Sequence, residues 1–151
     1  MVLAENQKLL IPSKTENIVL VEKLVDDICD LFDIKEQIFG HILVALTEAV
    51  NNALQHGNKA MPDKHIEITF KVKNNTLYFT VKDEGHGFDF NNLADPTDPA
   101  NIEKPTGRGI FLMKHLADNV SFEDNGTKLI LEFKMNDPAA ELRGINTNTL
   151  Y

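Results

Sequence analysis

Two polar side chains interrupt an otherwise apolar helical segment and could act together chemically. Glu48 and Asn52 are four residues apart, so on an α-helix they project from the same face, one turn apart. A carboxylate above a carboxamide suits two tasks: polarising a nucleophile, and holding a hard metal ion that prefers oxygen ligands. The alternative is a pair of polar residues on a solvated helix face. The pair alone does not decide between these interpretations.

A glycine-rich motif follows the end of a predicted strand. It reads Asp-Glu-Gly-His-Gly-Phe over residues 83–88, and its Gly85 and Gly87 allow close backbone approach and positive φ. Asp83, at the strand end, can accept a hydrogen bond from an exocyclic amine such as that of adenine. The alternative is a plain glycine-rich turn with a capping aspartate.

A second glycine motif, Thr-Gly-Arg-Gly-Ile over residues 106–110, contains the predicted start of a helix. Gly107 and Gly109 would leave the first N–H groups of that helix uncovered, and the helix dipole would help these groups bind an anion. The alternative is a flexible hinge. Further on, the hydroxyl of Thr127 could bridge to Asp83, or Thr127 could be an ordinary β-branched strand residue.

Hydrophobic periodicity predicts the elements that position these motifs. Alternation of apolar and polar residues predicts two β-hairpins and a short strand, with strands over 66–72, 77–81, 120–123, 128–135 and 8–12. Helical spacing predicts helices over 20–31, over 38–53 and after Gly107. Ser13 and Thr15 are candidate helix caps, and Gly57 is expected to end the second helix as a C′ glycine.

This order of elements predicts an α+β fold. We expect a two-layer α/β sandwich, in which three helices cover one face of a mixed, mainly antiparallel sheet. One domain would span residues 1–151, with its core over about 8–135 and a flexible tail over 136–151. The aperiodic segment from Gly85 to Thr106 is predicted to be a functional lid.

Composition narrows the classes of function. The 151 residues have ordinary globular proportions, 42% hydrophobic and 25% charged, with a single cysteine. The net charge of −8 argues against a nonspecific nucleic-acid binder, although backbone N–H groups and a divalent cation could still bind a nucleotide. The sequence shows neither a secretory signal nor an apolar run of about 18 residues, so we expect no membrane association and a cytoplasmic location.

Taken together and in this order, the motifs resemble the ATP-binding domain with the Bergerat fold that DNA gyrase, Hsp90, histidine kinases and MutL share (the GHKL superfamily). Residues 48–57 resemble its N box, 83–88 and 106–113 its two glycine boxes, and 126–127 its late Gly-Thr. Within that superfamily, residues from about 9 to 135 are similar to bacterial anti-sigma factors of the serine-protein kinase type.

The resemblance implies ATP and Mg²⁺ as cofactors. Asn52 would hold Mg²⁺, and Glu48 would be the general base toward a serine or threonine hydroxyl of a partner protein. Asp83 would bind the adenine amine with support from Thr127. The residues that the resemblance assigns to ATP binding are Asn52, His56, Asp83, Gly85, Gly87, Gly107, Arg108, Gly109 and Thr127.

Two of these assignments keep an alternative. His56, at the end of the N-box helix, could contact the nucleotide or cap the helix C-terminus. Arg108 lies beside the phosphate-binding glycines and could instead contact a partner protein or the lid.

The implied function is an anti-sigma factor with ATP-dependent serine/threonine kinase activity. It would phosphorylate an anti-anti-sigma protein of the STAS type, sequester a sigma factor and form a homodimer. One alternative is an ATP-binding switch module without significant kinase activity. Another is a histidine-kinase-like ATPase fragment, which is disfavoured because only about 35 residues precede the N-box helix.

Overall fold

The computed structural model of the chain describes residues 6–91 and 105–135. The predicted lid falls partly on residues 92–104 and the predicted tail on residues 136–151, and both ranges lie outside the described residues. The strands are β1 (Asn6–Pro12), β2 (His65–Lys73), β3 (Thr76–Lys82), β4 (Asn119–Glu123) and β5 (Lys128–Lys134). The helices are α1 (Ile18–Leu31), α2 (Glu36–Asn52) and α3 (Pro105–Leu116), and a π-helical turn, η2 (Ala53–Gly57), extends α2.

The five strands form one sheet in the order β1-β2-β3-β5-β4. Every pairing between these strands is antiparallel. The β2–β3 hairpin turns at Asn74 and Asn75, whose φ angles of 50° and 61° are those of a type I′ turn. Asparagine tolerates this left-handed conformation, so the two residues fix the register that pairs Lys73 with Thr76.

One face of the sheet is apolar because buried and exposed residues alternate along each central strand. A row of phenylalanines crosses this face. Phe79 lies between Phe70 and Phe133, with ring centroids 5.5 Å and 6.1 Å apart. The three side chains are almost fully buried and form the centre of the core.

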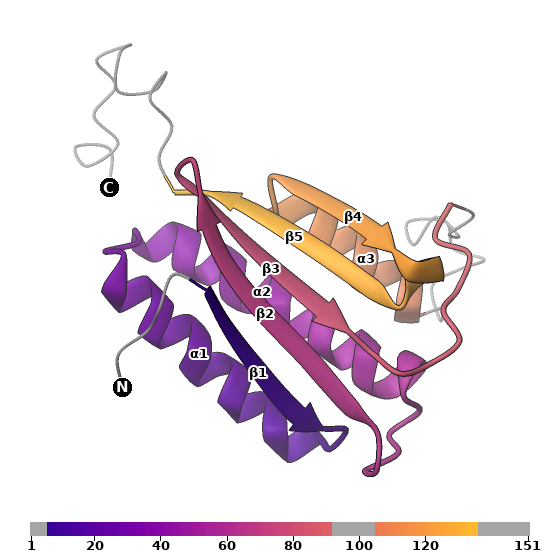
Figure 1. Cartoon of the computed structure of the whole chain (residues 1–151). Coiled ribbons are helices and arrows are strands. Elements are labelled where there is room, and N and C mark those ends of the chain that lie inside the picture. Colours follow the sequence, from indigo (N-terminus) through magenta and orange to yellow (C-terminus); the bar gives the residue numbers. More distant parts are fainter. Residues whose placement is uncertain (1–5, 92–104, 136–151) are drawn as a thin grey trace.

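The three helices lie on the apolar face of the sheet, and α2 packs between α1 and α3 (Figure 1). Buried residues recur at helical spacing on α2: Ile42, Ala45, Leu46, Ala49 and Val50. The predicted two-layer α+β fold, with three helices on one face of the sheet, is therefore confirmed. Within residues 6–91 and 105–135, no helix is long and apolar enough to cross a membrane.

Two local predictions were wrong, for reasons that matter to the site. Neither Ser13 nor Thr15 caps a helix: the Ser13 hydroxyl donates a hydrogen bond to the carbonyl of Lys64, 2.8 Å away, and Thr15 lies inside a short 3₁₀ turn before α1, whose N-cap is Asn17. Gly57 is not a left-handed C′ residue, since Gly87 and Gly126 are the glycines with positive φ in the described chain. It instead closes η2, and glycine is needed there because a Cβ atom would lie 2.4 Å from the Asp83 carboxyl carbon.

The phenylalanine row gives a direct test of the core. Replacing Phe79 with alanine removes a fully buried ring between two others, so the free energy of unfolding should fall by about 3–5 kcal/mol. Lys71→Ala, at an exposed position on neighbouring β2, is the control and should change it by less than about 0.5 kcal/mol. Urea denaturation measures both. Equal stability of the two variants would contradict this account of the core.

Candidate functional site

Asp83 lies immediately after β3 and is held by two backbone interactions. Its N–H donates to the carbonyl of Thr127 over 2.9 Å, which continues the β3–β5 pairing by one residue. Its Oδ1 accepts a hydrogen bond of 2.8 Å from the N–H of Gly85. The carboxylate also contacts the backbone of Gly57 at the end of η2. Its position is therefore fixed by both the sheet and the helix layer.

Burial raises the pKa of the Asp83 carboxyl above its ordinary value, because the charged form loses solvation. The hydrogen bond from Gly85 and the positive charge of Lys64 oppose this shift in part. A half-buried carboxylate with few compensating charges lowers the stability of the folded protein. Such a group is more common at a functional site than on an ordinary turn.

A cavity of about 140 Å³ opens beside Asp83, between the sheet and helices α2 and α3. A dry cavity of roughly 150 Å³ can hold one benzene ring, so this space suits a ring-sized group. Several predicted ATP-binding residues line it: Asn52, His56, Asp83, Gly87 and Thr127. The fold therefore brings together residues that the sequence places on three separate segments.

Apolar side chains make up most of the remaining wall. They come from α2, β3, α3, β4 and β5, and include Ala49, Val81, Ile110, Phe122 and Leu129. A mainly apolar cavity with one carboxylate in its lining can bury an aromatic ring and accept one hydrogen bond from the edge of that ring. That combination fits a purine with an exocyclic amino group.

Glu48 and Asn52 converge on helix α3 at Gly109. A Cβ atom at Gly109 would lie 3.0 Å from Asn52 Nδ2 and 3.2 Å from Glu48 Oε2, so the glycine gives these two side chains room. Asn52 Nδ2 is buried and has no hydrogen-bond partner within the described residues. A buried donor of this kind, beside a cavity, suits a ligand that offers an acceptor. Asn52 lines the cavity, whereas Glu48, one turn earlier, does not.

Helix α3 starts earlier than the sequence indicated. It begins at Pro105, two residues before Gly107, rather than within the glycine motif. Proline suits the first position of a helix because it has no N–H to satisfy. The N–H of Gly107 is therefore among the first N–H groups of the helix, which have no intrahelical acceptor. The exposed Arg108 follows it, and Gly109 lies deeper and makes the close contact with α2. Phosphate binding by these residues stays a prediction.

Thr127 is connected to Asp83 through its backbone. Its hydroxyl donates to the carbonyl of Asp124 over 2.8 Å, and its own carbonyl accepts the N–H of Asp83. The structure therefore contains no direct bridge between the threonine hydroxyl and the carboxylate. His56 is exposed on η2 at the edge of the cavity, so its two predicted roles both stay open.

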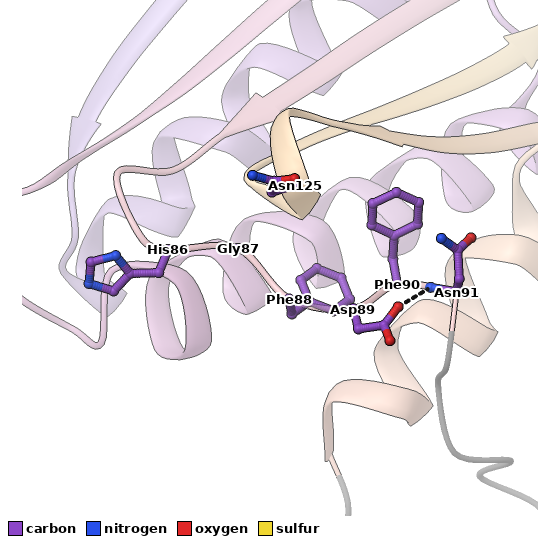
Figure 2. A pocket seen from close by; sticks show the side chains of 7 residues that line it. All are labelled: His86, Gly87, Phe88, Asp89, Phe90, Asn91 and Asn125. Atoms are coloured by element: carbon purple, nitrogen blue, oxygen red, sulfur yellow. Dashed lines mark hydrogen bonds between the residues drawn. The ribbon is translucent and has the colours of Figure 1, made fainter.

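The segment that leaves the site is fixed to the β4–β5 turn. The N–H of Phe88 donates to the carbonyl of Asn125 over 2.9 Å, and Gly87 passes so close that a Cβ atom would lie 2.0 Å from that oxygen. Figure 2 shows residues 86–91 running beneath Asn125 and lining an open hollow of about 430 Å³. Gly87 has a φ of 82°, which explains the need for glycine at this position.

Sequence reasoning missed three residues that shape the site. Phe88 and Phe122 form an edge-to-face pair with centroids 5.5 Å apart, and both line the cavity. Asn58, next to Gly57, is completely buried. In the sequence Asn58 lies in a polar stretch, as loop residues do. The only local indication of its role is that it directly follows the N box.

Comparison with known proteins identifies the family of this chain. A family model described as "Histidine kinase-like ATPase domain" matches residues 11–133. The chain belongs to this family. It is 28% identical over 134 residues to proteins named "Serine-protein kinase RsbW" from Bacillus cereus (strain AH820) and Bacillus anthracis, with 84% of this chain and 83% of each relative covered.

A solved structure has the same fold. It contains the RsbU and RsbW domains of Rv1364c from Mycobacterium tuberculosis, and it matches with a TM-score of 0.64 and 14% sequence identity. The match covers 88% of this chain but 33% of the solved chain, so this chain spans about a third of that protein. The likeness extends the family assignment to the three-dimensional arrangement of strands and helices.

The donor set at Asn52 fits a magnesium ion held jointly with phosphates. No group of three or more histidine, cysteine, aspartate or glutamate residues in the described chain could hold a metal on its own. Mg²⁺ commonly takes one or two protein ligands and completes its coordination with phosphates and water. The Oδ1 oxygen of Asn52 can supply that small share, and the unsatisfied Nδ2 of the same amide can donate to a phosphate oxygen.

The contact at Gly109 should be essential for this arrangement. Gly109→Ala places a methyl group against Asn52 and Glu48, so we expect ATP affinity in the presence of Mg²⁺ to fall at least about tenfold through misplacement of both side chains. Calorimetric titration measures the affinity. Gly40→Ala is the matched control on α2, since a Cβ atom there meets nothing within 4 Å. It should leave binding unchanged and raise stability by about 0.4–1 kcal/mol. Identical affinities in the two variants would contradict this role for Gly109.

The raised pKa of Asp83 predicts a pH-dependent cost in stability. At low pH the carboxyl is protonated in both folded and unfolded chains, so it carries no penalty. As the pH rises past the ordinary value of 3.8, the unfolded chain ionises first, and the folded state loses relative stability. Asp83→Asn should therefore raise the thermal midpoint at neutral pH, and the gain should vanish toward acid.

Thermal scans across this pH range test the prediction. Asp63→Asn controls for the loss of one negative charge, because Asp63 is exposed in the connection before β2. A neutral-pH midpoint for Asp83→Asn below that of the wild type would mean that favourable interactions of the carboxylate outweigh its burial.

Proposed function

We propose that the protein is an anti-sigma factor with ATP-dependent serine/threonine kinase activity. It phosphorylates an anti-anti-sigma protein and sequesters a sigma factor. The observation that carries the proposal is the convergence of Glu48 and Asn52 on Gly109, beside a ring-sized cavity with Asp83 at its end. The serine-protein kinase names of the relatives that cover most of this chain support the same activity.

In this proposal the cavity binds the adenine of ATP. The Asp83 carboxylate accepts a hydrogen bond from the 6-amino group, and the apolar wall around Phe122 buries the ring. Gly107 and Arg108, in the first turn of α3, lie near the phosphates. Asn52 holds Mg²⁺, which neutralises phosphate charge when bound.

Glu48 serves as the general base in the proposed transfer. A serine or threonine hydroxyl of the partner attacks the γ-phosphorus, the bond from that phosphorus to the β–γ bridging oxygen breaks, and ADP leaves. The hydroxyl proton passes to the Glu48 carboxylate. Transfer of this kind depends mainly on positioning and charge neutralisation, so a carboxylate one helical turn from the metal ligand is well located to accept the proton.

The proposed partners are a STAS-type anti-anti-sigma protein as phosphate acceptor and a sigma factor as the sequestered protein. A homodimer is the proposed assembly. These proposals rest on the family resemblance, and the names of the relatives support the kinase part.

An ATP-dependent switch without phosphoryl transfer is the second candidate. One observation favours it: Glu48 does not line the cavity that Asn52 and Asp83 line. A switch needs nucleotide binding and a change in partner affinity, but no base.

Glu48→Gln separates the two functions. With Mg-ATP and a STAS-type partner, transfer of labelled γ-phosphate should slow roughly 10²–10⁴-fold, while ATP affinity stays close to that of the wild type. Glu36→Gln, in the exposed first turn of the same helix, is the control and should transfer at the wild-type rate. Wild-type protein that binds ATP and its partner but transfers no phosphate would favour the switch.

A further inference from the structure

Asn58 is a completely buried carboxamide in which every hydrogen-bonding group of the amide has a partner. Its Nδ2 donates to Ser13 Oγ over 2.8 Å and to the carbonyl of His65 over 3.0 Å. Its Oδ1 accepts the N–H of Glu84 over 2.7 Å. Since only the nitrogen can donate and only the oxygen can accept, these partners also fix which way the amide points.

The partners of Asn58 come from segments that are distant in sequence. Ser13 follows β1, His65 begins β2, and Glu84 follows β3. The backbone N–H of Asn58 donates to the carbonyl of Ala53 over 2.8 Å, which closes η2. One side chain therefore connects the end of the α2–η2 helix to three strand ends.

The bond to Glu84 bears directly on the candidate site. Glu84 lies between Asp83, whose carboxylate ends the cavity, and Gly85, whose N–H donates to that carboxylate. On the other side of Asn58, the Gly57 carbonyl lies against Gly85, where a Cβ atom would be only 2.2 Å away. Asn58 thus holds both backbone segments that contact the Asp83 carboxylate.

We infer that Asn58 is a positioning residue that sets the preference of the site for adenine, acting through Asp83. The inference rests on the proposed function, in which Asp83 accepts a hydrogen bond from the 6-amino group. A carboxylate selects for that amine only if its oxygen stays at a fixed place. When Asn58 is lost, the Glu84 N–H loses its acceptor. The turn from Asp83 to Gly85 then keeps its packing against Gly57 and the bond from the His65 N–H to the Glu84 carboxylate, but loses the backbone hydrogen bond that fixes Glu84 between Asp83 and Gly85.

The test compares ATP with purine riboside triphosphate, which is ATP without the 6-amino group. The measured quantity is the ratio of their dissociation constants, obtained by calorimetric titration on the full chain with Mg²⁺. A hydrogen bond to a charged acceptor should make the wild-type ratio roughly tenfold or more. Partial unfolding lowers the apparent affinity for both nucleotides by the same factor and leaves the ratio unchanged. A purely structural role of Asn58 would therefore not alter the ratio.

Three variants provide the comparison. Asn58→Ala should lower the ratio to below about threefold, since the Glu84 N–H loses its acceptor. Asn58→Asp keeps an oxygen toward Glu84 and should retain most of the wild-type ratio, although it loses the donors to Ser13 and His65. Ser13→Ala, the matched control, removes a partner on the far side of the network and should lower stability without altering the ratio. Asn58→Ser, whose shorter side chain does not span to Glu84, replaces the alanine variant if that variant does not fold.

The outcomes separate this inference from the proposed function. A wild-type ratio near one, or a ratio that Asp83→Ala leaves unchanged, overturns the adenine site and this inference with it. A ratio that depends on Asp83 but survives in Asn58→Ala or Asn58→Ser overturns the inference alone. A loss confined to those two variants, with Asn58→Asp and Ser13→Ala close to wild type, supports it.

Discussion

The close approach of two backbone segments fixes the geometry on which the site depends. The end of the α2–η2 helix and the turn after β3 meet where a Cβ atom on Gly85 would lie 2.2 Å from the Gly57 carbonyl oxygen. No side chain at position 85 fits between them, and a Cβ atom at Gly57 would instead meet the Asp83 carboxyl group. This contact sets how far α2 extends across the sheet, and it places the polar end of that helix beside Asp83. The cavity, its carboxylate and the pair formed by Glu48 and Asn52 all follow from that alignment.

Several features of the site lower stability, which is expected where a protein is shaped for binding. The Asp83 carboxyl is partly desolvated, and the buried Asn52 Nδ2 has no partner among the described residues. The rest of the sandwich compensates through burial. Phenylalanine rings on β2, β3 and β5 are packed across the apolar face, with Phe79 at the centre. The well-packed core in the middle of the sheet therefore holds in position the Asp83 carboxyl and the Asn52 amide, whose burial costs stability.

Sequence alone predicted the helices and strands that a local pattern of apolar residues specifies. The helix that carries Glu48 and Asn52 and both hairpins were predicted because their periods of apolar residues are regular. It did not predict Asn58, because the partners of that side chain lie 45 and 26 residues away and no local pattern encodes such pairs. Gly57 was assigned the wrong conformation for a related reason. A glycine selected for close tertiary approach looks, in sequence, the same as one selected for positive φ.

The spacing of Glu48 and Asn52 allows each side chain to serve a different substrate in the proposed reaction. Four residues on an α-helix separate the two side chains by just over one turn, roughly 6 Å along the axis. Asn52 faces the cavity and Glu48 does not, so a nucleotide in the cavity would leave the glutamate at its margin. A second substrate would have to reach that margin from solvent, near the exposed Arg108 at the start of α3. Gly109 lets α3 pack closely against α2 at this point, because it has no side chain that would displace Glu48 or Asn52. The same glycine that brings the helices together thus leaves room for the proposed metal ligand, Asn52, and the proposed base, Glu48.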